Sequence, residues 1–101
     1  MKVVEINDSN IEELVKADGK TVVDCYAPWC SPCRMLAFTM DELSTEMENV
    51  HFYKINIDDN EKTTDKYDIM SIPTVLFFED GELKDKLVGL KTKDEIKTYL
   101  I

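Results

Sequence analysis

The sequence predicts an α/β fold in which one mixed β-sheet carries helices on both faces, in the order β-α-β-α-β-α-β-β-α. Segments rich in β-formers alternate with segments of helical periodicity through most of the chain, which is typical of strands joined by crossover helices. Two further β segments flank Asp80-Gly81, a dipeptide typical of hairpin turns. With 101 residues the chain has room for one hydrophobic core, so we expect a single domain over residues 1–101.

The first strand, the first helix and the central strand are expected before the first cysteine pair. Residues 3–6 predict a short strand. Ser9 and Glu12 match the pattern of a capping box, which predicts that a helix begins there and ends at Gly19. Residues 21–26 are nearly all β-formers with one acid among them, which predicts a central strand covered on both faces.

A turn and a long helix follow the central strand. The turn covers residues 27–32, and Pro32 lies near the start of the helix, where its missing N–H costs no helical hydrogen bond. The helix is expected over residues 33–48. Its apolar side chains recur at spacings of three and four, namely Leu36, Met40, Leu43 and Met47. Residues 50–57 predict the third strand.

The remaining elements are a short helix, a hairpin and a final helix. The helix is expected over residues 61–67, and the hairpin pairs residues 74–78 with 83–88. Thr92 and Glu95 match a second capping box, which predicts the start of the last helix. The inner face of that helix carries Ile96, Tyr99 and Leu100.

Composition argues against several classes of partner. The chain has 21 acidic and 12 basic residues, a net charge of −9, and an acidic surface repels both nucleic acid and anionic membranes. The longest strongly apolar run, residues 75–78, is too short to cross a bilayer, and residues 1–5 cannot form the core of a signal peptide. We therefore expect a cytoplasmic monomer that binds neither nucleic acid nor membranes.

Cys30 and Cys33 form a C-x-x-C motif, which occurs in redox couples, zinc sites and iron–sulfur sites. The pair lies at a predicted strand-to-helix junction, where the free N–H groups of the helix would stabilise a thiolate on Cys30. We expect Cys30 to attack a substrate disulfide and Cys33 to resolve the mixed disulfide. A zinc site needs four ligands, and Cys25 and His51 do not form a second pair, so we expect no metal.

Asp24 is an acid inside a predicted buried strand. An ionised and unpaired carboxylate would be costly there, so Asp24 either titrates at high pH or has a partner, for which Lys54 is the candidate. Two interpretations stay open: a structural pair of Asp24 and Lys54, or a proton acceptor for Cys33. Cys25 points to the opposite face of the sheet and is expected in the core, whereas His51 is expected at the surface.

The segment Trp29-Cys30-Ser31-Pro32-Cys33 resembles the active site of thioredoxins, usually written W-C-G-P-C. The likeness covers essentially the whole chain and includes residues 22–24, 54–58, 66–74, 78–81 and 88–89. It implies the thioredoxin fold, with Cys30 as nucleophile, Cys33 as resolving thiol, and Asp24 as a buried acid beside Lys54. It also implies a reductant of protein disulfides that a thioredoxin reductase recharges, with no cofactor other than its own disulfide.

The resemblance further implies a cis-proline and a docking groove for substrate chains. Pro73 is the expected cis-proline, packed against the disulfide. Small or flat groups in the groove leave room for an extended peptide, which the backbone at Ser71-Ile72 can bind by hydrogen bonds. The expected groove residues are Trp29, Ser31, Pro32, Ile72, Pro73, Val88 and Gly89.

Three positions depart from the thioredoxin pattern. Ser31 replaces a glycine, and its hydroxyl is expected to donate to the Cys30 thiolate and to make the pair slightly more oxidising. Phe38 replaces a proline that kinks the helix, so we expect a straighter helix. Ser71 replaces a glycine beside the groove, which bears on substrate preference.

Three other functions are compatible with these residues. An oxidase or isomerase would use the same dithiol, but such relatives typically carry a histidine between the cysteines, where this chain has Ser31-Pro32. A binding module would use the groove and not the dithiol. A metal carrier would use the thiolates as ligands.

Overall fold

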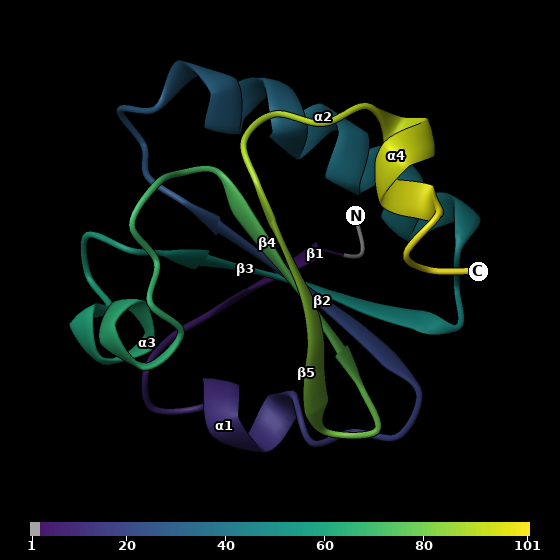
Figure 1. Ribbon diagram of the computed structural model, residues 1–101, viewed down its shortest axis with the longest axis horizontal. Helices are drawn as coiled ribbons and strands as arrows, with labels where there is room; N and C mark the ends of the chain where they lie inside the picture. The colour runs from purple at the N-terminus through teal and green to yellow at the C-terminus, as the bar shows by residue number, and fades with distance from the viewer. Residues whose placement is uncertain (1–2) are drawn as a thin grey trace.

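The computed structural model describes residues 3–101 and contains a five-stranded mixed sheet with the strand order β1-β3-β2-β4-β5 (Figure 1). Strands β1, β3 and β2 are parallel to one another, whereas β4 and β5 run antiparallel as a hairpin at one edge. The strands are β1 (Val3–Ile6), β2 (Lys20–Tyr26), β3 (Val50–Asn56), β4 (Thr74–Glu79) and β5 (Glu82–Val88). The helices are α1 (Ile11–Leu14), α2 (Ser31–Glu46), α3 (Glu61–Lys66) and α4 (Lys93–Lys97).

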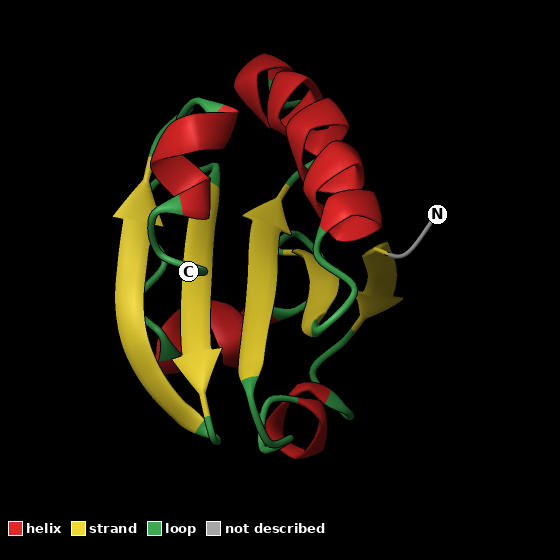
Figure 2. Cartoon of the chain, turned by 90° about the vertical axis from the view of Figure 1, so that its right-hand side faces the viewer, coloured by secondary structure: helices red, strands yellow, loops and turns green. Residues whose placement is uncertain are grey.

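Helices cover both faces of the sheet, as the sequence predicts. Helices α2 and α4 lie on one face and α1 and α3 on the other, with the sheet between them (Figures 1 and 2). Successive side chains of β2 point to opposite faces. Val22 therefore packs under α2 and α4, while Val23 and Cys25 pack toward α1 and α3.

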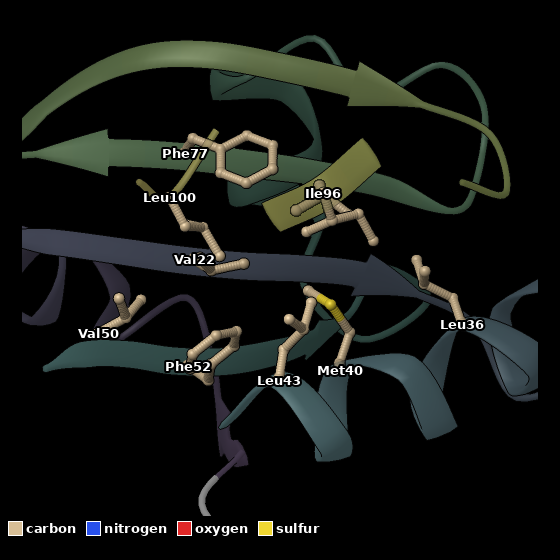
Figure 3. Close-up of a cluster of buried hydrophobic side chains, with 10 residues drawn as sticks. Val22, Leu36, Met40, Leu43, Val50, Phe52, Phe77, Ile96 and Leu100 are labelled. Carbon is tan, nitrogen blue, oxygen red and sulfur yellow. The ribbon is translucent and has the colours of Figure 1, made fainter. Parts of the chain in front are cut away.

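The core under α2 and α4 is drawn in Figure 3. It joins three strands to both helices, because the apolar side chains at spacings of three and four on α2 all point toward the sheet. Its buried members are Val22, Leu36, Met40, Leu43, Val50, Phe52, Val75, Phe77, Ile96 and Leu100.

One of the two predicted capping boxes forms and the other does not. At α4, the Thr92 hydroxyl accepts a hydrogen bond from the Glu95 N–H, and the Glu95 carboxylate accepts one from the Thr92 N–H. At α1, the prediction for Ser9 and Glu12 is wrong: Asn7 Oδ1 accepts hydrogen bonds from both the N–H and the hydroxyl of Ser9. The N-cap residue of α1 is Asn10, so Ser9 lies one residue before the capping position, and the helix has only four residues.

Several element boundaries differ from the prediction for local reasons. Helix α1 ends before Gly19, whose φ of +82° lies in a separate turn, where its N–H donates to Asp80 Oδ1 at 2.8 Å. Helix α2 begins earlier than expected because Cys30 itself is the N-cap residue. At the hairpin turn, Asp80 and Gly81 both have positive φ angles, 51° and 87°, which confirms the predicted turn.

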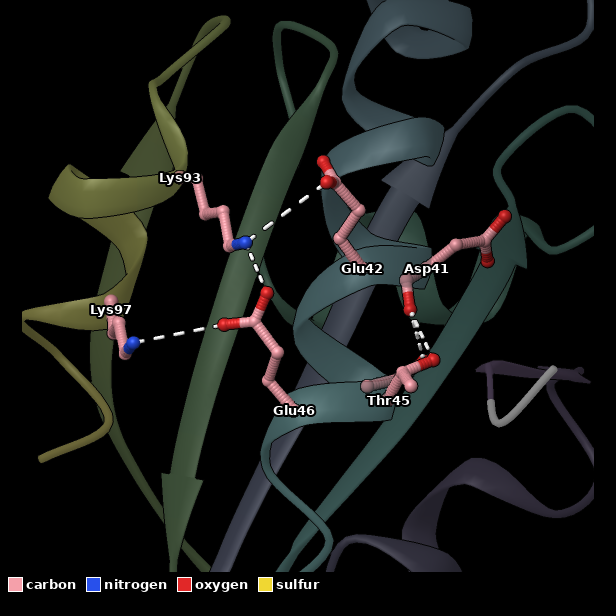
Figure 4. A network of polar contacts seen from close by, with 7 residues as sticks. Asp41, Glu42, Thr45, Glu46, Lys93 and Lys97 are labelled. Atoms are coloured by element: carbon pink, nitrogen blue, oxygen red, sulfur yellow. Dashed lines mark hydrogen bonds and ion pairs between the residues drawn. The ribbon is translucent and has the colours of Figure 1, made fainter.

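Ion pairs join the exposed sides of α2 and α4 (Figure 4). Lys93 pairs with Glu46 and lies 4.0 Å from Glu42, while Lys97 lies 3.7 Å from Glu46. Exposed pairs of this kind contribute little to stability individually. The buried side chains beneath them therefore account for most of the attachment of α4.

Candidate active site

Cys30 and Cys33 form a disulfide at the N-terminus of α2, with their Cα atoms 5.2 Å apart. The Cys30 sulfur accepts a hydrogen bond from the Cys33 N–H at 3.3 Å and so caps the 16-residue helix. Both side chains are buried, with Cys30 5% and Cys33 2% exposed. A thiolate on Cys30 would be stabilised at this position by the N–H groups and the partial positive charge of the helix.

Arg34 holds the turn that carries the cysteines, a contact that the sequence analysis missed. Its Nη1 donates to the Pro28 carbonyl at 2.9 Å and its Nη2 donates to Ser31 Oγ at 3.0 Å. The Ser31 hydroxyl thus accepts a hydrogen bond from Arg34, and because Cys30 is in the disulfide here, the hydrogen bond from Ser31 to the Cys30 thiolate stays a prediction. In the sequence, only the spacing of three residues between Ser31 and Arg34 on one predicted helix could have indicated the contact between their side chains.

Trp29 lies beside the disulfide with 68% of its surface exposed. Its Nε1 donates to Asp58 Oδ2 at 2.8 Å. Asp58 follows β3 and Trp29 follows β2, so the carboxyl ends of two neighbouring parallel strands bring the two side chains together. The bond holds a flat apolar surface next to the cysteines.

The Ile72–Pro73 peptide bond is cis, as the resemblance implies. Ile72 packs against the small buried cluster that contains both cysteines, and the Pro73 carbonyl accepts a hydrogen bond from the Gly89 N–H at 2.8 Å. Val88, next to Gly89, is 48% exposed. Of the seven predicted groove residues, Trp29, Ser31, Pro32 and Val88 are exposed, Ile72 and Gly89 are half-buried, and Pro73 is buried.

A lysine on the edge strand β5 binds the segment that leads to Pro73. Lys86 Nζ, on β5, donates to the carbonyls of Tyr67 and Asp68, each at 3.2 Å. Asp68 has a φ of 53°, so the chain turns sharply there after α3. Lys86 is a second residue near the site that the sequence analysis did not identify.

Asp24 lies on β2 beneath α2 and is 3% exposed. It lines an open pocket of about 310 Å³ together with Cys33, Ala37 and Lys54, among others. Burial raises the pKa of the Asp24 carboxyl to about 7, although the positive charge of Lys54 acts in the opposite direction. Asp24 Oδ1 accepts no hydrogen bond from any described group of the protein.

The structural pair of Asp24 and Lys54 does not form. The two residues are direct neighbours in the register of β2 and β3, but the Lys54 ammonium lies 4.0 Å from the carboxylate of Glu5 instead. The ion pairs found within residues 3–101 include none between Lys54 and Asp24. Of the two interpretations of Asp24, the structural ion pair is therefore wrong.

The other candidate ligands lie away from the site. Cys25 is fully buried on the opposite face of the sheet, and His51 is exposed and stacks on Tyr53, so both predictions are confirmed. Burial raises the pKa of the Cys25 thiol, which disfavours its thiolate. Across residues 3–101, no three His, Cys, Asp or Glu side chains are grouped to hold a metal ion. None of the helices described is long and apolar enough to span a membrane.

A comparison with models of known protein families shows to which family this chain belongs. The family model described as Thioredoxin matches residues 2–101. The chain belongs to the thioredoxin family. With its Cys30–Cys33 pair at the start of α2, this thioredoxin-family protein is a thiol–disulfide oxidoreductase.

Individual relatives include thioredoxins from bacteria and from a chloroplast. The chain is 38% identical to the thioredoxin of Staphylococcus haemolyticus, over 99% of this chain and 96% of that one. It is 37% identical to the thioredoxin of Mycoplasmoides gallisepticum, over 93% and 94%. It is 47% identical to the chloroplastic M-type thioredoxin of Pisum sativum over 94% of this chain, and it spans only 59% of that protein.

A solved structure supports the thioredoxin fold. It comes from a study of the thiol resolving mechanism in yeast mitochondrial 1-Cys peroxiredoxin via glutathione/thioredoxin systems. The TM-score is 0.89, over 97% of this chain and 92% of that chain, at 24% sequence identity. This likeness confirms the thioredoxin fold that the sequence predicts.

Proposed function

We propose that this thioredoxin-family protein reduces disulfides of other proteins and is returned to its dithiol form by a thioredoxin reductase. The observation that carries the proposal is the Cys30 sulfur at the N-cap of α2, hydrogen-bonded to the Cys33 N–H. A thiolate held in this way is both the nucleophile of the exchange and a good leaving group. A reductant of this kind works in a reducing compartment such as the cytoplasm.

The exchange proceeds in two steps that transfer two electrons. The Cys30 thiolate attacks one sulfur of the substrate disulfide, which breaks that bond and releases one substrate sulfur as a thiolate. Cys33 then loses its proton and attacks Cys30 Sγ, which forms the Cys30–Cys33 disulfide and releases the second substrate sulfur. The substrate disulfide is reduced and the protein dithiol is oxidised.

Asp24 accepts the proton of Cys33 in the second step. Both side chains line the same pocket, which is open to water, so a proton can pass between them directly or through water. A pKa of about 7 suits a base that works near neutral pH. Lys54 lines the same pocket and adjusts the proton affinity of Asp24 through its charge.

The substrate chain docks beside the disulfide in an extended conformation. Trp29 and Val88 offer exposed apolar surface, and Ile72 contacts the cysteine cluster itself. The backbone at Ser71-Ile72 precedes β4 and is able to pair with an extended peptide. We expect the remaining groove residues, Ser31, Pro32, Pro73 and Gly89, to leave space for the peptide because these residues are small or flat.

The reduction potential of Cys30–Cys33 tests the direction of the reaction. We expect about −270 mV, the value typical of thioredoxins, measured by equilibration with thiol/disulfide buffers. A potential near −180 mV would instead indicate an oxidant or an isomerase. The Cys30→Ser, Cys33→Ser double variant is the control: any partner function that survives it belongs to a binding module and not to the dithiol.

A further inference from the structure

Three charged residues form a row across the first three strands of the sheet. Glu5 on β1 is the register partner of Lys54 on β3, and Lys54 is the register partner of Asp24 on β2. Register partners in parallel strands point to the same face of the sheet. The row therefore places one ammonium between two carboxylates, and it lies on the face that α2 covers.

Tyr26 lies next to this row, two residues after Asp24 on the same strand and on the same face of the sheet. Its hydroxyl donates to both carboxylate oxygens of Glu5, at 2.7 and 2.9 Å. The Lys54 ammonium lies 4.0 Å from Glu5 Oε1 and 5.9 Å from the centre of the Tyr26 ring. Glu5 thus offers Lys54 an anion on the strand opposite to that of Asp24, and the Tyr26 ring offers it an aromatic face.

We propose that Glu5 and Tyr26 are positioning residues that draw Lys54 away from Asp24 and so keep the Asp24 carboxyl without an ion-pair partner. The inference rests on the proposed function, in which Asp24 accepts the proton of Cys33. A carboxylate paired directly with an ammonium binds a proton weakly and is a poor base for a thiol. Tyr26 fixes the Glu5 carboxylate, and Glu5 in turn competes with Asp24 for Lys54.

The other groups around Asp24 do not supply a second cation at the carboxylate. From α2, Cys33 and Arg34 line the same pocket, but the Arg34 guanidinium is bound to the Pro28 carbonyl and the Ser31 hydroxyl. From β4, the register partner of Asp24 is Val75, which carries no charge. After burial and the charge of Lys54, the charge of Glu5 is the third influence on the pKa of Asp24, and it acts upward.

The test is to titrate Asp24 itself in the oxidised protein, where neither Cys30 nor Cys33 carries a proton. Glu5→Gln keeps an acceptor for the Tyr26 hydroxyl but removes the charge that holds Lys54. We expect the Asp24 midpoint, followed by the carboxyl carbon signal in NMR, to fall by about 1 pH unit as Lys54 turns toward Asp24. Tyr26→Phe keeps the ring but frees the Glu5 carboxylate, and we expect a smaller fall in the same direction.

A double-variant comparison separates positioning of Lys54 from the direct field of Glu5 on Asp24. In a Lys54→Met background no ammonium is left to move, so Glu5→Gln should shift the Asp24 midpoint by less than about a third as much. Equal shifts with and without Lys54, or no shift in either background, would overturn the proposal. Glu12→Gln is the matched control, since Glu12 is an exposed acid paired with Lys66 outside the pocket.

Kinetics distinguish a failure of this inference from a failure of the proposed function. Single-turnover reduction of a protein disulfide by Asp24→Asn at neutral pH tests the role of Asp24 as the proton acceptor, whatever Glu5 does. If Asp24→Asn slows the reaction, the pH profile of Glu5→Gln should shift to lower pH together with the Asp24 midpoint. A slowed Asp24→Asn variant and an unshifted Glu5→Gln midpoint would leave the proposed function in place and overturn the role of Glu5.

Discussion

Asp24 is ionisable but lies where an ionised group is poorly solvated. Its carboxyl is 3% exposed, and burial raises its pKa to about 7 from the 3.8 of a free aspartate. The folded protein therefore binds the Asp24 proton more tightly than the unfolded chain does. Between these two pKa values the folded state loses stability as the pH rises, and the full cost is present only above about pH 7.

Asp24→Asn should remove this cost. We expect the variant to be more stable than the parent by up to about 4 kcal/mol near pH 9, since three pKa units correspond to about that energy. At about pH 3, where Asp24 is protonated in both the folded and the unfolded state, the difference should be much smaller. Urea denaturation of the oxidised proteins at both pH values measures it. A stability gap of the same size at both would contradict the buried-acid explanation.

At the scale of elements, short polar contacts decide where helices begin and how loops are held. The two capping-box patterns have equivalent residues, yet only Thr92 caps its helix, because α1 begins one residue later than the pattern predicts and Asn10 is its N-cap residue. Lys86 has a comparable local role: it ties strand β5 to the carbonyls of Tyr67 and Asp68. Those carbonyls precede the cis-proline segment, so a contact on an edge strand supports the groove.

Lys86→Met should loosen the segment before Pro73 without touching the cysteines. We expect kcat/KM for a protein disulfide to fall by about fivefold and the reduction potential to stay unchanged. The fivefold fall corresponds to the loss of a hydrogen bond worth about 1 kcal/mol. Lys84→Met is the matched control, because Lys84 lies on the same strand and its salt bridge is to Glu82. Equal losses in the two variants would show a general effect of surface charge.

At the scale of the whole molecule, the sheet separates two hydrophobic cores, and the active site lies above its carboxyl-terminal edge at the start of α2. The short helix α4 closes the core under α2, in which Ile96 is fully buried (Figure 3). Tyr99, just beyond α4, stacks on Phe77 with ring centres 5.0 Å apart. The ion pairs between α4 and α2 lie outside these contacts and are screened by solvent and salt.

Ile96→Ala should therefore destabilise the molecule far more than loss of the surface ion pairs. We expect a cost of about 2–5 kcal/mol in the free energy of unfolding, because the side chain leaves a cavity under α4. Ile101→Ala is the control: this residue is 83% exposed and should change stability little. Urea denaturation compares both variants with the parent. A small effect of Ile96→Ala would show that α4 contributes little to the stability of the fold.

The sequence alone determined the features that depend on near neighbours in the chain. Helical spacing, turn dipeptides and the Cys30–Cys33 motif predicted the mixed α/β sheet, the hairpin and the nucleophile at a helix N-terminus. These features follow from local sterics and hydrogen bonding, which act over a few residues. The resemblance to thioredoxins added the cis-proline and the groove residues around it.

Only the tertiary structure decided which distant side chains meet. Glu5, Asp24 and Lys54 come from three strands, and their register shows Lys54 beside both acids. The side-chain contacts then show that Lys54 pairs with Glu5, where the sequence suggested Asp24. Trp29 meets Asp58 for a similar reason, because two strand ends coincide. Such pairings depend on strand register and on competition between neighbouring groups, and neither leaves a pattern along the chain.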